Sequence, residues 1–143
     1  MALFMMLVGI MGLVQGCRST PPEAPIEGEI LVGQGGGFTG LYSGHLVHSD
    51  GLVFRWSQMP GQPERLEAAG SVPADSLQPF LRQLAQWERE QFSVTGSSNI
   101  IAFVEFRHAD RRYRLQWGLG EEVSSEIQGF YVALLQFLRR HLP

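Results

Sequence analysis

The chain has 143 residues, a net charge of −3 and a hydrophobic content of 44%. This length suits one hydrophobic core, and the acidic balance argues against a general nucleic-acid-binding protein. All 11 basic residues are arginine, which excludes mechanisms that need a lysine, such as Schiff-base chemistry or a phosphate-loop lysine.

The N-terminal segment has the pattern of an export signal that ends in a lipidation site. Residues 1–14 form an apolar run that is too short to span a bilayer. The segment Leu13-Val14-Gln15-Gly16-Cys17 resembles the lipobox of bacterial lipoproteins, in which the cysteine is lipidated and becomes the first residue. Cys17 is the only cysteine in the chain, and lipidation consumes a thiol that is otherwise a liability in an exported protein. We therefore expect a signal peptide over residues 1–16 and a lipid anchor of the palmitate type on Cys17.

One feature departs from the usual signal pattern, because no Lys or Arg precedes the apolar run. The alternatives are a start codon further upstream, an ordinary export signal with an incidental cysteine, or a buried N-terminal segment of a cytosolic protein. The polar, proline-rich stretch after Cys17 favours the lipoprotein. Arg18-Ser19 lacks the aspartate associated with inner-membrane retention, so the outer membrane is preferred. Residues 17–28 are expected to be a semi-rigid tether and residues 29–143 one domain.

The first half of the expected domain has the pattern of consecutive antiparallel strands. Asp50-Gly51, which lies between two β-rich runs, is a strong hairpin signal. The run that follows it places Leu52, Phe54 and Trp56 on one face of a strand, since side chains alternate along strands. The expected strands are 29–32, 41–47, 52–56 and, as an optional fourth, 65–68.

The second half carries two helical stripes and a second hairpin. Asp75 or Ser76 is the expected N-cap of the first helix, and Ser124 or Ser125 is that of the last one. Residues 100–107 are apolar on both faces, which predicts an internal strand. The apolar positions are Leu77, Phe80, Leu81, Leu84 and Trp87 in the first helix, Tyr113, Leu115 and Trp117 in the last strand, and Ile127, Tyr131, Leu134, Leu135 and Leu138 in the last helix.

The order of these elements, β-β-β-(β)-α-β-β-α, indicates the fold class. It contains no repeated strand–helix–strand unit of the kind that builds a parallel sheet. We therefore expect an α+β fold, with a single antiparallel sheet of about five to six strands and two helices packed on one face.

The glycine-rich run Gly35-Gly36-Gly37-Phe38-Thr39-Gly40 is the candidate site. It formally fits G-x-G-x-x-G, but a dinucleotide site needs a helix directly after the glycines, and here a strand follows. We interpret the run as a hairpin or bulge in which glycine supplies positive φ angles. The loop tip is suited to entering a partner's cleft, unless Phe38 folds back into the core. The candidate partner-binding residues are Gly36, Gly37, Phe38, Thr39 and Gly40.

The remaining polar residues predict no catalytic or metal site. His45 and His48 are three residues apart, which puts them on opposite faces of a strand. His48-Ser49-Asp50 has the residue types of a catalytic triad, but adjacent turn residues cannot form its hydrogen-bonded chain. The arginines of the last hairpin form either a solvated face balanced by Glu105 and Asp110, or a contact for an anion or partner. These arginines are Arg107, Arg111, Arg112 and Arg114. We expect no enzyme activity, no metal and no cofactor.

Several patches together resemble a family of small bacterial lipoproteins of uncharacterised activity. They are the glycine-rich run, Ser49-Asp50-Gly51, Asn99 before an apolar strand, Trp117-Gly118 and Phe130-Tyr131. The resemblance covers nearly all of residues 29–143, although Ser97-Ser98-Asn99 stands where that family has a Pro-Gly-Asn turn.

A fainter likeness is to emfourin-type inhibitors of thermolysin-like metallopeptidases. Their Gly-Gly-Phe-x-Gly element is matched by Gly36-Gly37-Phe38-Thr39-Gly40, and a helix and a β-hairpin follow in both. The likeness implies a related fold and a peptidase-inhibitor role.

We therefore expect a non-enzymatic envelope lipoprotein that its lipid anchor holds at the membrane. Its expected function is to bind another protein, such as a peptidase. The alternative is a lipoprotein that binds a small molecule or lipid between its sheet and helices. That alternative requires an apolar cavity.

Overall fold

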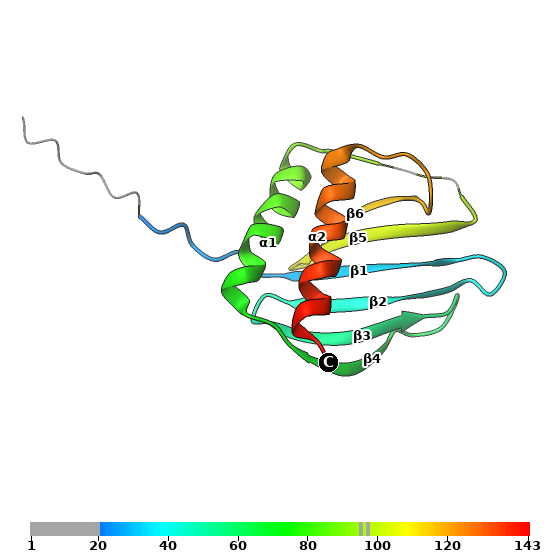
Figure 1. Ribbon diagram of the computed structural model, residues 1–143, viewed down its shortest axis with the longest axis horizontal. Coiled ribbons are helices and arrows are strands. Elements are labelled where there is room, and N and C mark those ends of the chain that lie inside the picture. Colours follow the sequence, from blue (N-terminus) through cyan, green and yellow to red (C-terminus); the bar gives the residue numbers. More distant parts are fainter. Residues whose placement is uncertain (1–20, 95, 97) are drawn as a thin grey trace, which may run out of the picture.

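A six-stranded antiparallel sheet carries two helices on one face (Figure 1). This computed structural model describes residues 21–143 except residues 95 and 97. The elements are β1 (Glu29–Gly36), β2 (Leu41–His48), β3 (Leu52–Gln58), β4 (Arg65–Ser71), α1 (Ala74–Arg89), β5 (Ile100–His108), β6 (Arg111–Gly118) and α2 (Ser125–His141). The strand order is β4-β3-β2-β1-β5-β6. The expected α+β class is confirmed, and the optional fourth strand is present.

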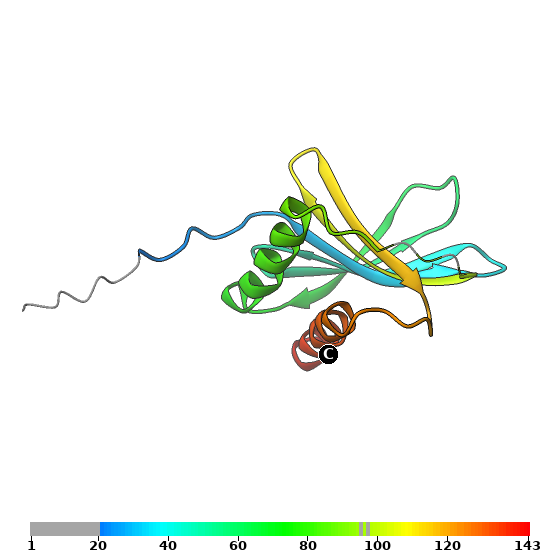
Figure 2. The same cartoon turned by 90° about the horizontal axis from the view of Figure 1, so that it is seen from above.

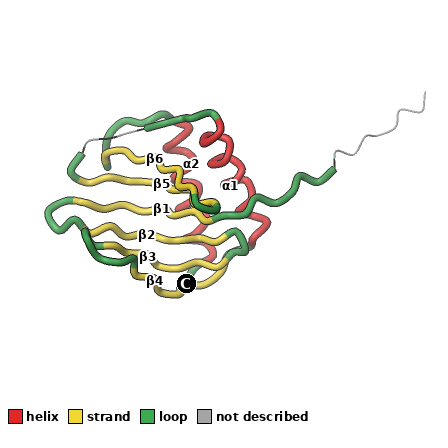
Figure 3. The backbone as a smooth tube through the Cα atoms, turned by 180° about the vertical axis from the view of Figure 1, so that it is seen from behind, coloured by secondary structure: helices red, strands yellow, loops and turns green. Residues whose placement is uncertain are grey.

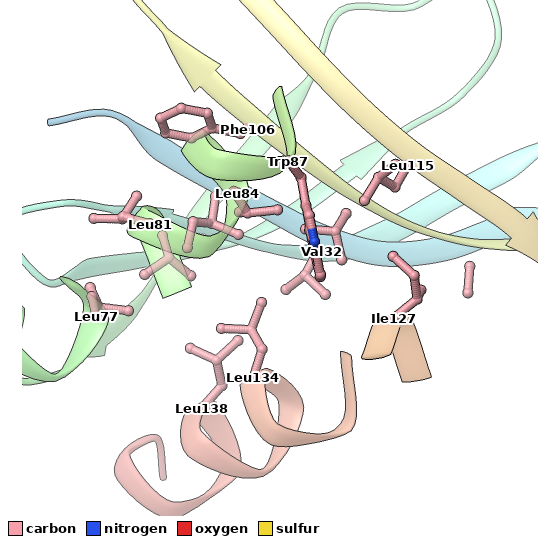
Figure 4. Packing of buried hydrophobic residues seen from close by; sticks show 14 of the residues in the cluster. Val32, Leu77, Leu81, Leu84, Trp87, Phe106, Leu115, Ile127, Leu134 and Leu138 are labelled. Atoms are coloured by element: carbon pink, nitrogen blue, oxygen red, sulfur yellow. The ribbon is translucent and has the colours of Figure 1, made fainter. Parts of the chain in front are cut away.

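The main core lies between the sheet and the helices (Figure 4). Strand alternation supplies Ile30 and Val32 from β1 and the equivalent positions of the other strands. Each helix contributes one apolar stripe, as expected from the spacing of its large residues. The buried helical residues are Leu77, Leu81, Leu84 and Trp87 in α1, and Ile127, Leu134 and Leu138 in α2.

The helix starts agree with the sequence pattern in one case and differ in the other. Ser124 is the N-cap of α2, and its hydroxyl accepts a hydrogen bond from the N–H of Ile127 (3.4 Å). The expected N-cap of α1 at Asp75 or Ser76 is wrong, because the helix already begins after Pro73. Proline fixes φ near the value at which a helix is entered, so it starts α1 without a side-chain cap. Asp75 then lies in the first turn, where its negative charge is favourable.

A second apolar cluster lies on the sheet face that the helices do not cover. Figure 3 shows the backbone of the molecule from this side. We call this second cluster the open-face cluster; its four buried residues are Leu31, Leu46, Trp56 and Phe103. The rings of Trp56 on β3 and Phe103 on β5 are 5.8 Å apart between centroids. These two strands are separated by β2 and β1 in the sheet. The sheet curls towards this face, which helps the rings to meet: Figure 2 shows the β5–β6 hairpin and the β3–β4 loop rising on the side away from the helices.

Two glycines permit the close approach of β1 and β2 at the centre of this curl. Gly33 and Gly44 are cross-strand partners. A Cβ atom on Gly44 would lie 2.0 Å from the carbonyl oxygen of Val32, and one on Gly33 would lie 2.3 Å from that of Ser43. Any larger residue would have to push the two strands apart, so their close approach depends on glycine at both positions.

The last residues of the expected tether belong to the folded body. Ile26 packs against the main core and exchanges two hydrogen bonds with the side-chain amide of Gln78, at 2.8 and 3.2 Å. The expected signal peptide and Cys17 lie outside the described residues. Within the part of the chain that the structure describes, no helix is long and apolar enough to cross a membrane.

Candidate functional site

The β1–β2 hairpin presents Phe38 to solvent at its tip. Residues 37–40 form the turn between the two strands, and the side chain of Phe38 is fully exposed. Gly36, Gly37 and Gly40 have φ angles of 105°, 68° and 64°, which residues with side chains rarely adopt. The glycine-rich run is thus a hairpin turn, as interpreted from the sequence. Of the two positions expected for Phe38, the structure has the exposed one.

Contacts on both sides hold the hairpin tip. The backbone N–H of Gly37 donates to the carbonyl oxygen of Asn99 (2.7 Å), and the N–H of Leu41 donates to the hydroxyl of Thr39 (3.3 Å). On the other side Gly40 lies against Pro60, since a Cβ on Gly40 would be 2.8 Å from the Cγ of that proline. A loop held in this way loses little conformational freedom when it binds a partner.

Four further apolar side chains are exposed at the same end of the sheet. Leu41 and Ile100 flank Gly36 in one cross-strand row, because both are register partners of that glycine. The N–H of Leu119 donates to the carbonyl oxygen of Ile100 (2.8 Å), which places this leucine beside the row. Met59 lines a hollow of about 300 Å³ together with residues of the β3–β4 loop. We call this group the hairpin end; its residues are Phe38, Leu41, Met59, Ile100 and Leu119.

Sequence patterns identified only Phe38 in the hairpin end. The other four residues lie at strand ends or in loops, where each reads as an ordinary apolar residue of a strand or turn. The register of β1 with β2 and β5 places Leu41 and Ile100 in one row, and a backbone hydrogen bond places Leu119 beside Ile100. A single exposed apolar side chain is common on protein surfaces, whereas a group is typical of an interaction site.

The hairpin end lies opposite the point where the N-terminal segment joins the sheet (Figure 1). That segment enters at Glu29, and β1 then runs for 8 residues to the hairpin. At about 3.3 Å per residue the strand separates the two ends by about 26 Å.

The arginines of the β5–β6 hairpin are mostly engaged with acidic side chains. Arg107 binds Glu105 (2.7 Å) and Glu64 (2.6 Å), and Arg114 binds Glu105 (3.3 Å). Arg111 lies 3.8 Å from Glu88 on α1. The carboxylates that balance these arginines are therefore Glu105 and Glu64, and not the expected Glu105 and Asp110. Glu64 is 43 residues from Arg107 in the sequence. This arrangement favours a structural role over the anion contact that the sequence left open.

The same ion pairs set the electrostatics of the open face. A hydrogen bond from Arg107 holds the pKa of Glu64 below its usual range, although burial acts in the opposite direction. Glu105 is 5% exposed, and two arginines neutralise its charge. The guanidinium of Arg114 also lies 3.9 Å from the ring centroid of Phe103, where it covers the open-face cluster by a cation–π contact.

The histidines occupy opposite faces of β2, as expected. His45 faces the side that carries the helices, and burial lowers its pKa, as does the nearby Arg55. His48 lies on the other face, 3.2 Å from a carboxylate oxygen of Glu29 and against the ring of Phe54. In the described part of the chain, no three His, Cys, Asp or Glu residues are grouped so that they could hold a metal ion.

The centre of the space between the sheet and the helices is filled by side chains, and open hollows of about 470 and 350 Å³ lie at its margins, beside α1 and beside the end of α2. Leu84 of α1 and Leu134 of α2 have no exposed surface, and Val32 of the sheet lies between the two helices in Figure 4. The larger hollows are open to solvent; one of about 690 Å³ lies over β2, β3 and β4 and is lined mainly by polar residues. This packing gives no support to a lipid held between sheet and helices.

No protein-family model, curated protein or solved structure matches this chain. The distinctive feature of the described residues is a hydrogen-bonded hairpin turn with three glycines at positive φ and a fully exposed aromatic side chain at its tip.

Proposed function

We propose that this chain is a lipid-anchored protein of the bacterial envelope that binds another protein through the hairpin end and catalyses no reaction. The observation that carries the proposal is the full exposure of Phe38 on a hairpin tip held by Asn99 and Pro60. The anchor is the expected lipid on Cys17. The outer membrane is preferred because Arg18-Ser19 lacks the aspartate associated with inner-membrane retention.

The energetics of the hairpin suit a binding loop. Moving a phenylalanine side chain from water into a partner's pocket contributes about 1.5–3 kcal/mol, and aromatic anchors dominate many protein interfaces. Because the tip is already ordered, little of that gain is lost to fixing the loop. Leu41, Ile100 and Leu119 extend the apolar surface around the anchor.

The direction of the hairpin supports a partner in the aqueous compartment. The tether from Cys17 to Ile26 spans about 28 Å if it is extended as proline-rich segments are. The strand β1 adds about 26 Å in the direction away from the tether. Phe38 would then stand about 50 Å from the lipid surface, which suits a protein partner better than the membrane itself.

The sharper form of the proposal is a peptidase inhibitor. It is supported by the likeness of Gly36-Gly37-Phe38-Thr39-Gly40 to the emfourin-type element and by the shape of the hairpin. A narrow loop that is rigid before binding enters an active-site cleft without the ordering cost of a flexible peptide.

Affinity capture from the envelope fraction of the native host tests the binding surface. Three baits would be compared: the wild-type domain, a Phe38→Ala, Thr39→Ala variant, and a Leu52→Ala control that removes an exposed leucine from the other end of β3. We expect a protein that the wild type and the control retain and that the hairpin variant loses. Equal capture by all three baits would contradict the proposal.

Residual activity of a thermolysin-like metallopeptidase, measured against increasing concentrations of the domain, tests the sharper form. We expect stoichiometric inhibition by the wild type and a loss of inhibition with Phe38→Ala. If a large molar excess of the domain gives no inhibition and the captured partner is not a peptidase, the inhibitor role is rejected. The proposal that the chain binds a protein would then still stand.

A further inference from the structure

The two edge strands of the sheet, β6 and β4, differ in whether other backbone segments hydrogen-bond to their outer edges. At β6, the N–H of Gly96 donates to the carbonyl oxygen of Gln116 (3.1 Å), and the N–H of Gln116 donates to that of Val94 (3.3 Å). The chain therefore covers the part of this edge around Gln116 with its own backbone. At β4, no strand or backbone hydrogen bond within the described residues covers the outer edge of Arg65–Ala68. An uncovered edge offers a row of donors and acceptors to another strand.

The uncovered edge is short and has defined limits. Pairing of β3 with β4 is regular from Ser57 opposite Arg65 to Phe54 opposite Ala68, and the register then shifts. Beyond the shift the C-terminus packs over the face of β4 that carries the helices, since a Cβ on Gly70 would lie 3.2 Å from the side chain of Leu142. The accessible edge is therefore about four residues long, or about 13 Å.

The side chains of this edge carry a pattern that an added strand can match. Arg65 and Glu67 face the hollow of about 690 Å³ on the side that carries the helices, together with His45 and Arg55. Glu67 is 3.8 Å from Arg55 in an ion pair that is largely exposed. On the other face Leu66 is half exposed and lies opposite Trp56 in the register.

We propose that β4 is a docking edge for an extended segment of a partner protein, which adds an antiparallel strand over Arg65–Ala68. Directly opposed pairs of opposite charge stabilise neighbouring strands, and like charges oppose pairing. The segment then carries a basic residue opposite Glu67, an apolar residue opposite Leu66 and an acidic residue opposite Arg65. Its backbone supplies the affinity and these three side chains supply the specificity.

A second copy of this chain has the same pattern at Arg65-Leu66-Glu67, but the geometry disfavours it. Antiparallel pairing of two β4 edges turns the two sheets in opposite directions, so their N-terminal segments leave on opposite sides. Two chains anchored as proposed above in one membrane could pair in this way only if both tethers turned back towards it. We therefore assign the edge to a different protein.

Fluorescence anisotropy with short labelled peptides tests the docking edge, using the full chain in a mild detergent. The probe is a peptide of seven residues with Lys-Leu-Glu at its centre, flanked by Val and Thr. The matched control has Glu-Leu-Lys at its centre, and a second control carries the probe sequence with alternate backbone nitrogens methylated. We expect the wild type to prefer the probe over the reversed peptide by about tenfold and not to bind the methylated one.

Charge reversal on the protein supplies the decisive comparison. The Arg65→Glu, Glu67→Arg variant changes two exposed side chains and should prefer the reversed peptide by a similar factor. Phe38→Ala should bind the probe as the wild type does, which separates this edge from the hairpin end. The proposal is overturned if the wild type does not bind the probe, if the methylated peptide binds equally well, or if charge reversal leaves the preference unchanged.

Discussion

The open-face cluster and the hairpin end are both apolar groups that the helices leave uncovered, yet only one of them is sealed. Phe103 in the cluster has no exposed surface, whereas Phe38 at the hairpin is fully exposed. The cluster is closed by the curl of the sheet and by an ion-pair network that reaches from Glu64 to Arg114. The curl of the sheet and these ion pairs thus bury aromatic side chains without a helix, but they do not cover the hairpin. The comparison teaches that Phe38 is exposed because of the conformation of its own loop.

The largest effect on this contrast should come from removing the centre of the sealed cluster. Phe103→Ala should lower the free energy of unfolding by about 3–5 kcal/mol, because it leaves a cavity beneath Trp56 and Arg114. Urea unfolding followed by tryptophan fluorescence measures the change. A loss below about 1 kcal/mol would mean that the cluster contributes little to the fold.

Breaking the ion-pair network should be nearly as costly. Arg107→Ala leaves Glu105 buried with fewer partners, and removal of one member of a buried pair costs about 3 kcal/mol. The Arg107→Ala, Glu105→Ala double variant removes the stranded charge as well and should recover part of the loss in the same unfolding experiment. Equal instability of both variants would contradict a main cost from the unpaired charge of Glu105.

The link between Glu64 and Arg107 should make stability depend on acid pH. The pKa of Glu64 is lowered in the folded state, so the folded protein binds fewer protons than the unfolded chain below about pH 5. The contribution of this pair is present above the unfolded pKa and is lost as the pH falls through the folded one. Glu64→Gln should cost about 1 kcal/mol at pH 7 and should flatten the acid limb of the stability profile. An unchanged profile in this variant would assign the acid dependence to other carboxyls.

The smallest effect on stability should come from the hairpin tip. Phe38→Ala should change the free energy of unfolding by less than about 0.5 kcal/mol, since the side chain is fully exposed. Thermal unfolding of the wild type and this variant, side by side, measures the difference. A loss above about 2 kcal/mol would mean that Phe38 packs into the body in solution, and the proposed binding site would then fail.

The fold followed largely from local patterns in the sequence. The helical stripe ending at Trp87 and the clean alternation around Leu115 each placed an element on the correct face of the core. The Asp50-Gly51 signal placed the β2–β3 turn, where the N–H of Gly51 donates to the carbonyl oxygen of His48. These features depend on residues close together in the chain, so the sequence pattern contains them.

The features that depend on distant residues could not be predicted in the same way. The alternation of Leu52, Phe54 and Trp56 correctly put them on one face, but it did not show that this face lies away from the helices. The sealing of that face needs Glu64 and Arg107, which only the tertiary structure brings together. The sequence likewise left Phe38 between core and solvent, because its exposure depends on contacts of its neighbours with Asn99 and Pro60.

Photo-crosslinking in living cells tests most directly whether the hairpin end binds a protein. A photoreactive amino acid would replace Phe38 in the full chain and, as the matched control, Leu52 at the opposite end of the sheet. We predict a discrete crosslinked species in the envelope fraction with the probe at position 38 and none with the probe at position 52. Absence of a crosslink at position 38, or the same species from both positions, would contradict the account of the hairpin as a binding site.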